Sequence, residues 1–214
     1  RILDDRIGID ATLYKSNTFN QLILVSSPSS SGYSQGWINC GNIQNTGIEL
    51  LLNASPVRSE KFRWGIDLNF TRNWNKVIEL TETTTVYELS RGNLSVGSPK
   101  AVVGKPFGEI YTKGYERNAE GKIIVDAQGV PKITSLYTHY LGNYNYDWRG
   151  GLTNSFSYGN WNLSCLIDIN YGGVRQSITE AHLLQSGTGK ETLKGREDGF
   201  IFDGVKADGT PNDI

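Results

Sequence analysis

Apolar and polar residues alternate along five separate stretches of this chain. In the clearest of them, the apolar side chains Phe62, Trp64, Ile66, Leu68 and Phe70 alternate with Arg63, Gly65, Asp67, Asn69 and Thr71. A period of two residues places the two sets on opposite faces of an extended strand. The pattern therefore predicts a β-strand with one apolar and one polar face.

Four more stretches follow the same rule, and together they predict five long strands. The expected strands cover residues 4–14, 46–55, 62–71, 147–158 and 161–172. The chain of 214 residues contains 25 Gly, 11 Tyr, 7 Phe and 5 Trp. Glycine and aromatic residues with few helix signals favour an all-β fold.

The connections between these strands alternate between long and short. Two are tight turns, at residues 56–61 and at Gly159-Asn160, whereas the segments 15–45, 75–146 and 173–214 are expected to be long outer loops. Short turns at one end and long loops at the other are typical of outer-membrane barrels, whose strands need about 9–11 residues to cross. The predicted fold is a set of antiparallel up-and-down strands forming part of a large transmembrane β-barrel with long extracellular loops.

Tryptophan residues lie at the ends of the predicted strands. Trp64, Trp74, Trp148 and Trp161 occupy such positions, where amphipathic rings collect at membrane–water interfaces. We therefore expect the apolar face of each strand to contact lipid. The polar face, which includes Glu49, is expected to line a lumen.

Two other protein classes have to be weighed against this interpretation. In a soluble carbohydrate-binding β-sandwich module, the same aromatics would fill a core between two sheets. A secreted β-rich hydrolase would need carboxylates that converge in one cleft. The acidic residues here are scattered over turns and strand ends, so we expect no catalytic residue and no enzyme.

Six stretches, in order and over nearly the whole chain, resemble the barrel portion of SusC/RagA-type TonB-dependent transporters. The most specific is "NCGNIQNTGIE", in which Asn45, Gly47, Ile48 and Glu49 fit the family pattern, followed by "NWNKVIEL" from Asn73. The other matching segments begin with "DDRIGIDATLY", "VGKPFGEIYTKGYERNAEGKIIVDAQGVPK", "LGNYNYDWRGGLTNSFSYGNWNLSCLIDINYGG" and "GREDGFIFDGVKADGTPND".

The resemblance implies a function for the protein that carries this chain. It implies import of glycans, oligosaccharides or peptides across the outer membrane of a Gram-negative bacterium. A SusD-like surface lipoprotein would act as a lid, and TonB would couple energy through a part not in this chain. Because the sequence contains no Met and ends in the loop-like "ADGTPNDI", we expect it to be a segment of a longer protein. Its first and fifth strands would then be sheet edges.

Candidate substrate-binding residues fall into two groups. The lumen-facing charges Arg63, Asp67, Arg149 and Asp168 could line a polar pathway, or could pair with one another across neighbouring strands. Tyrosines crowd the third long segment, and Tyr111, Tyr115, Tyr140 and Tyr144 could bind sugar rings or peptide side chains. Alternatively, these rings anchor the loop.

Cofactors and nucleic acid are not expected as ligands. His139 and His182 are isolated, so no transition-metal site is predicted. The acidic stretch Asp203–Asp213 offers oxygen ligands for Ca²⁺, but it lacks the spacing of the helix–loop–helix calcium motif and reads as solvated turns. A formal net charge of -1 gives no indication of nucleic-acid binding.

The two cysteines are predicted to be free thiols. Cys40 is expected in an outer loop, and Cys165 on the apolar face in the middle of a strand. Residues at such different depths cannot form a disulfide bond, which needs Cα atoms within about 7 Å of each other.

Overall fold

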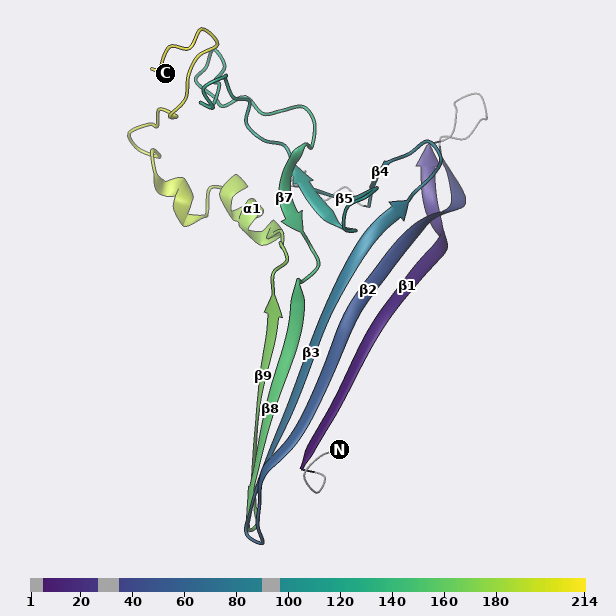
Figure 1. The fold of residues 1–214 in the computed structure, drawn as a ribbon. Coiled ribbons are helices and arrows are strands. Elements are labelled where there is room, and N and C mark those ends of the chain that lie inside the picture. Colours follow the sequence, from purple (N-terminus) through teal and green to yellow (C-terminus); the bar gives the residue numbers. More distant parts are fainter. Residues whose placement is uncertain (1–5, 27–34, 90–96) are drawn as a thin grey trace. The chain divides into compact units, whose positions relative to one another are not determined.

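A computed structural model describes residues 6–26, 35–89 and 97–214, and the fold in these ranges is all-β (Figure 1). Its long strands are β1 (Ile7–Ser26), β2 (Gln35–Arg58), β3 (Phe62–Glu79), β8 (Trp148–Tyr158) and β9 (Trp161–Tyr171). Its short elements are β4 (Val86–Glu88), β5 (Ser98–Val102), β6 (Glu109–Thr112), β7 (His139–Asn143), the helix α1 (Ile178–Gln185) and a 3₁₀ turn at Lys190–Leu193. Neither helical segment in the described part of the chain is long and apolar enough to cross a membrane.

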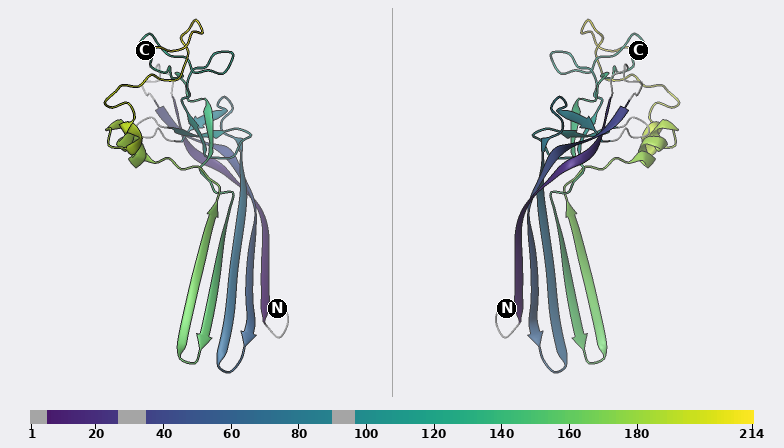
Figure 2. Two further views of the ribbon diagram at one scale, coloured as in Figure 1. Left: turned by 90° about the vertical axis from the view of Figure 1, so that its left-hand side faces the viewer. Right: turned by 90° about the vertical axis from the view of Figure 1, so that its right-hand side faces the viewer.

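The long strands form one antiparallel sheet in the order β1-β2-β3-β8-β9, and the short strands form a second sheet in the order β4-β5-β6-β7. The chain divides into two compact units. The first unit holds Arg1–Tyr87, Ala101–Gly108 and Asn143–Gly173, and the second holds Glu88–Lys100, Glu109–Gly142 and Val174–Ile214. In the first unit, the five strands lie side by side as a partial barrel wall, with β1 and β9 as edges (Figure 2).

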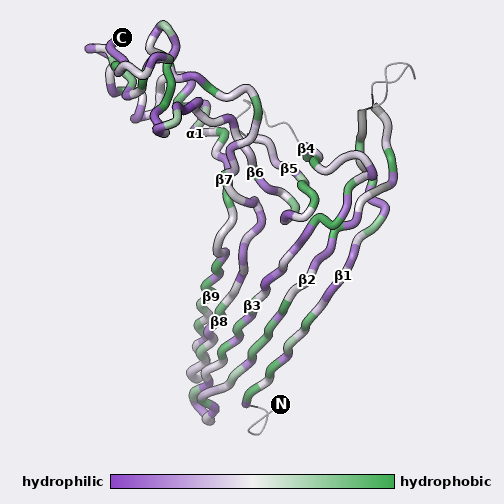
Figure 3. Tube along the Cα trace, turned by 45° about the horizontal axis from the view of Figure 1, so that its top comes forward, coloured by the Kyte–Doolittle hydropathy of each residue, from purple (hydrophilic) through white to green (hydrophobic). Residues whose placement is uncertain are grey.

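The register keeps like residues in rows across the sheet. One row runs through Ala11, Leu50, Phe70, Gly150 and Ile169, and the adjacent row runs through Thr12, Glu49, Thr71, Arg149 and Asn170. Apolar and polar residues therefore alternate along much of each long strand, as the colours in Figure 3 show. The sheet has an apolar face and a polar face because a strand turns successive side chains to opposite sides.

Both tight turns lie at the same end of this sheet, which we call the turn end (Figure 1). At the β8–β9 turn, Tyr158 pairs with Trp161, and Gly159 has a φ of 55°. A positive φ favours glycine, so the predicted two-residue hairpin is confirmed. At the other turn, the Ser59 amide donates to the Phe62 carbonyl at 2.8 Å. We call the opposite end the loop end.

The sheet has almost no hydrophobic core. Its predicted lipid row, Phe62, Trp64, Ile66, Leu68 and Phe70, is half-buried, although the sequence predicted exposed side chains. The cover comes from neighbours on the same face, because Phe156 stacks beside Phe62 and Trp64, and Trp148 lies beside Phe70. All eleven residues of β9 are exposed. Among the described residues of the first unit, the buried apolar side chains are Val77, Leu80 and Ala101, none of them in that row.

Strands β1 and β2 extend far beyond their predicted ends. The expected outer loop 15–45 is largely a continuation of their hairpin, with pairs from Lys15–Thr46 to Ser26–Gln35. Polar side chains sustain the pairing, since Asn17 donates to Asn42 at 2.7 Å and accepts from Gln44 at 3.2 Å. The prediction failed because residues 15–45 lack an apolar face, although cross-strand amide pairs also stabilise a ladder.

This longer hairpin changes the position of one cysteine. Cys40 lies within β2 opposite Gln21, so its predicted place in a loop is wrong. Cys165 lies mid-strand in β9 and is a free, exposed thiol, as predicted.

Gly47, the glycine of the "NTGIE" motif, has a packing role. A Cβ at this position would overlap the ring of Tyr14, which lies across the strand at Gly47. The Tyr14 hydroxyl thereby reaches β3 and donates to Asn73 Oδ1 at 3.1 Å, while Asn73 Nδ2 donates to Asn45 at 3.0 Å. The motif thus ties three strands together through an aromatic ring that only glycine admits.

The second unit contains three short hairpin turns of one kind. Each closes on a glycine with positive φ, namely Gly121, Gly129 and Gly209. The first two begin with Asn118 and Asp126, and each of these side chains accepts hydrogen bonds from two backbone amides. Val125 and Val205 are both buried, and the Val125 amide donates to the Val205 carbonyl at 2.9 Å.

Candidate functional site

The four predicted lumen charges all lie on the polar face of the five-stranded sheet. Arg63 is at the turn end opposite Ser157, and Arg149 is near the loop end opposite Thr71. Asp67 lies opposite Thr153, and Asp168 lies opposite Gly151. The register therefore brings these charges to one surface, without deciding whether a substrate contacts them.

These charges do not neutralise one another. The salt bridges found among the described residues all lie in the second unit. Asp67 instead accepts a hydrogen bond of 2.6 Å from Asn53, and Asp168 accepts one of 3.2 Å from Asn170. The Arg149 guanidinium lies 4.8 Å from the centre of the Tyr146 ring. Ion pairing of these charges across neighbouring strands, the alternative interpretation, is therefore not found among the described residues.

The four predicted tyrosines do not form a single platform. Tyr111 and Tyr140 lie with ring centres 5.5 Å apart, whereas Tyr115 lies beside Phe202. Tyr144 belongs to the first unit and packs edge-on against Phe107, over the backbone of Gly108. Burial raises the pKa of the Tyr144 hydroxyl. This ring is an anchor for the polypeptide that enters β8.

The Tyr111 hydroxyl is engaged by a buried carboxylate. It donates a hydrogen bond of 2.5 Å to Glu109, which is 4% exposed. This hydrogen bond, together with burial and the negative charge of Glu109, raises the pKa of Tyr111 to about 12. The Lys100 ammonium lies 5.3 Å from the centre of the same ring and donates to the Tyr137 carbonyl.

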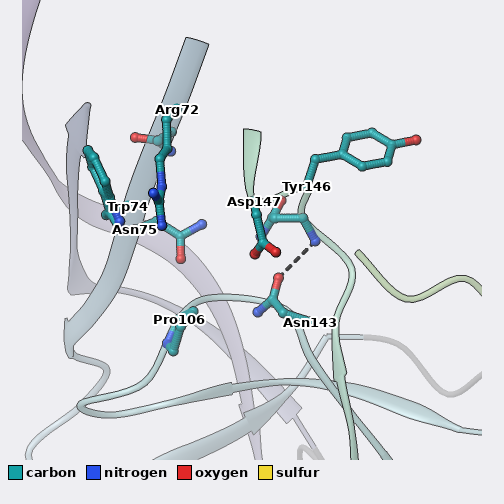
Figure 4. Close-up of a pocket in the computed structure, with 9 residues that line it drawn as sticks. Arg72, Trp74, Asn75, Pro106, Asn143, Tyr146 and Asp147 are labelled. Atoms are coloured by element: carbon teal, nitrogen blue, oxygen red, sulfur yellow. Dashed lines mark hydrogen bonds between the residues drawn. The ribbon is translucent and has the colours of Figure 1, made fainter. Parts of the chain in front are cut away.

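A pocket of about 140 Å³ opens at the loop end of the sheet, between β3 and the segment that enters β8 (Figure 4). The last β3–β8 pair is Thr71–Arg149, while β3 continues to Glu79. The two segments diverge there and leave the pocket. Its walls are formed by Arg72, Asn73, Trp74, Asn75, Pro106, Asn143, Asn145, Tyr146 and Asp147.

Three asparagines of this pocket hold one backbone residue, Phe107. The Phe107 amide donates to Asn75 Oδ1 at 2.8 Å. Its carbonyl accepts from Asn143 at 3.0 Å and from Asn145 at 2.8 Å. Because a backbone group away from strands needs a partner, these amides form a clamp on the polypeptide. Because these three asparagine side chains already bond to Phe107, they have fewer hydrogen-bonding groups left for a ligand.

The remaining pocket side chains offer aromatic and charged surface. The Arg72 guanidinium lies 4.6 Å from the centre of the half-exposed Trp74 ring. Asp147 is exposed and lies close to Gly172, where a Cβ would overlap its carboxylate. An aromatic face with planar polar groups suits sugar rings or peptide groups. Sequence reasoning missed this pocket, although most of its residues stand in the quoted segments "NWNKVIEL" and "LGNYNYDWRGGLTNSFSYGNWNLSCLIDINYGG".

No metal centre is formed by the described residues, since they contain no group of three His, Cys, Asp or Glu side chains suited to one. In the acidic stretch considered for Ca²⁺, Asp213 forms a salt bridge of 2.5 Å with Lys206, and Asp208 accepts hydrogen bonds from Thr210. These interactions lower the pKa of both carboxyl groups. The acids here stabilise a turn.

Comparison with curated proteins finds relatives of one type. The chain is 22% identical over 211 residues to TonB-dependent receptor P3 of Formosa agariphila, covering 88% of this chain and 20% of that protein. It is 28% identical over 136 residues to TonB-dependent receptor SusC of Bacteroides thetaiotaomicron, covering 59% of this chain and 14% of that protein. The chain thus spans a fifth or less of these two relatives. No family model matches the chain.

Solved structures show the same fold. The RagAB peptide transporter is 20% identical, with a TM-score of 0.57 over 77% of this chain and 19% of that chain. The "open-open" state of the RagAB peptide importer gives a TM-score of 0.58 at 21% identity, over 76% of this chain and 18% of that chain. The curated relatives are receptors rather than enzymes, which agrees with the prediction that this chain is not an enzyme. In sequence the chain is thus similar to TonB-dependent receptors, SusC among them, and in fold it is similar to the RagAB peptide transporter.

Proposed function

We propose that this chain forms part of the barrel wall of an outer-membrane importer for oligosaccharides or peptides. A SusD-like surface lipoprotein is its partner, and TonB acts on a part of the protein outside these residues. The relatives named SusC and RagAB support this assignment by analogy. In this proposal the turn end faces the periplasm and the loop end faces the exterior.

One observation carries the membrane location. The five-stranded sheet exposes or half-exposes its whole apolar face, and its described residues include no second sheet packed against that face. Leu13 is 79% exposed, and Leu163 is 66% exposed. Water does not stabilise a continuous apolar surface of this size, whereas the hydrocarbon of a bilayer does. A soluble carbohydrate-binding sandwich would bury the same face.

The polar face supplies the proposed pathway. Asp67, Arg149 and Asp168 offer hydrogen-bonding groups on neighbouring strands, and the pocket at the loop end adds Asp147. Such groups suit a hydrated substrate that carries hydroxyl or amide groups. Tyr111, Tyr115 and Tyr140 are proposed as contacts outside the wall.

The membrane location is tested with two spin labels on adjacent residues. One is attached to the native Cys165 after Cys40→Ser, and the other to Leu166→Cys in a background that lacks both native thiols. In the full-length receptor in lipid, we expect the label at position 165 to collide with oxygen and the label at 166 with a water-soluble nickel complex. Electron paramagnetic resonance measures both collision rates. Equal access of the nickel complex to the two labels contradicts the membrane location.

The import function is tested in cells. We expect Asp67→Asn with Asp168→Asn to slow uptake of the cognate oligosaccharide or peptide while leaving the amount of receptor in the outer membrane unchanged. Lys122→Gln, a solvent-exposed change in the second unit, is the matched control. If the double variant takes up substrate at the wild-type rate, these two carboxylates do not contribute to the pathway. If no surface lipoprotein copurifies with the receptor, the proposed partnership is wrong.

A further inference from the structure

Charge is distributed unequally between the two faces of the five-stranded sheet. Its described strands contain five carboxylates, and alternation places four of them on the polar face: Asp10, Glu49, Asp67 and Asp168. The fifth, Glu79, lies beyond a register shift and pairs with Asn42 at the end of β3. From the turn end to the pair of Lys76 with Gln44, the apolar face of the described strands therefore has no acidic side chain. It does have cations, and all of them lie toward one end.

The register gathers three cations on the apolar face near the loop end. Lys15 in β1 pairs with Thr46 in β2, which pairs with Trp74 in β3, so these residues form one row. Arg72 and Lys76 lie two residues to either side of Trp74 on the same face. With strands about 4.8 Å apart and a rise of about 3.3 Å per residue, the three cations fall within a patch of roughly 10 by 14 Å. We call Lys15, Arg72 and Lys76 the cationic patch.

These cations have no acidic partner. All three side chains are exposed, and none of them takes part in a salt bridge with the rest of the described chain. The only contact found for this set is that of Arg72 with the Trp74 ring. Asp147 lines the same pocket as Arg72 but forms no ion pair with it. Three unneutralised cations beside one aromatic ring require an external anion or water.

The patch directly adjoins the apolar band. Below the Lys15 row come the row of Leu13, Ile48 and Arg72 and then the row of Ala11, Leu50 and Phe70. A tryptophan beside cations at the rim of an apolar band matches the boundary between hydrocarbon and lipid headgroups, where long basic side chains extend toward phosphates. No such cluster lies at the turn end, where Phe62, Trp64 and Tyr158 occupy the same face.

We propose that the cationic patch binds the phosphate groups of anionic lipids in the leaflet at the loop end of the barrel, an inference that rests on the membrane location proposed above. A lipid surface fits this patch because its phosphates are negatively charged and because the patch adjoins the apolar band. A bound lipid would hold this part of the wall at a fixed depth. It would also orient the lower part of the β1–β2 hairpin.

The test places the full-length receptor in nanodiscs of phosphatidylcholine with a minor fraction of phosphatidylglycerol. Native mass spectrometry counts the phosphatidylglycerol that remains bound to the released protein. We expect Lys15→Gln with Arg72→Gln and Lys76→Gln to lower that occupancy by about fivefold or more. Arg63→Gln with Arg149→Gln, which removes cations from the polar face, is expected to leave it unchanged.

Each other outcome has a definite meaning. Equal phosphatidylglycerol occupancy in the wild type and the triple variant overturns the lipid site. Displacement of the lipid by excess inorganic phosphate also overturns it, because the patch would then bind free phosphate. If the wild-type protein does not enter nanodiscs at all, the membrane location fails instead. Should the triple variant not fold, Arg72→Lys is compared with Arg72→Gln, and only the latter is expected to lose lipid.

Discussion

The two units of this chain reach a defined structure by different means. The sheet of β1, β2, β3, β8 and β9 depends on continuous strand pairing and has almost no core, whereas the second unit depends on short turns closed by side chains. In the sheet, side-chain polarity decides which medium each face meets. In the turns, individual side chains replace missing backbone hydrogen bonds. A substitution should therefore act through the surrounding medium in the first unit and through local geometry in the second.

The largest expected effect is a charge on the apolar face. Leu68→Arg lies in the row of Leu52, Leu152 and Ile167, and in hydrocarbon it should destabilise the barrel by about 2–4 kcal/mol. Asn69→Arg, one residue further on the polar face, should cost much less. Unfolding of the full-length receptor in lipid by guanidinium measures both. Equal costs would mean that the two faces meet the same medium.

The sequence predicted the sheet well because the period of two depends only on which side chains share a face. It predicted β8, β9 and both tight turns closely, but it ended β1 and β3 too early and began β2 too late. In β1 and β2, amides such as Asn17 and Gln44 replace apolar residues there. The candidate site was less predictable. Arg63, Asp67, Arg149 and Asp168 reach one surface through the register, while the pocket arises where β3 and β8 diverge, and a break in pairing leaves no signal in residue polarity.

A second effect, smaller but still in the sheet, concerns Gly47. Gly47→Ala places a Cβ against the Tyr14 ring, and overpacking of this kind should cost about 1–3 kcal/mol. Gly65→Ala is the matched control, because its Cβ would lie 3.9 Å from Ser155. We expect Tyr14→Ala to abolish the penalty of Gly47→Ala in a double-mutant cycle. An additive cycle would show that the ring and the glycine act independently.

In the second unit, the corresponding test removes a turn-closing side chain. Asp126 accepts from the amides of Gln128 and Val130, both at 2.9 Å. Asp126→Ala should destabilise this turn by about 1 kcal/mol, because two acceptor contacts are lost. Hydrogen exchange at the two amides should accelerate about fivefold, without change in the five-stranded sheet. Gln128→Ala, which leaves the Asp126 acceptor in place, is the control. If hydrogen exchange is unchanged in Asp126→Ala, the Asp126 carboxylate does not close the turn.

The smallest effect is a titration in the second unit. Tyr111 has its pKa raised to about 12 by Glu109 and burial, so the neutral phenol is favoured in the folded protein. Stability from this pair is fully present below the ordinary tyrosine pKa of about 10 and is lost as pH rises between about 10 and 12. Ultraviolet absorbance of the phenolate should show Glu109→Gln bringing the pKa back toward its ordinary value. A tyrosine titration unchanged by this substitution would exclude Glu109 as the cause.

The unequal lengths of the strands also have a mechanical consequence. Strand β2 has 24 residues and β9 has 11, so at about 3.3 Å per residue their lengths differ by roughly 40 Å. An apolar band about 25 Å tall needs only the shorter length. In the proposed membrane location, the upper part of the β1–β2 hairpin therefore extends beyond the apolar band. An incoming molecule would then meet this extension before it meets the wall, and removing equal numbers of residues from both strands would shorten the extension without altering the strands beneath it.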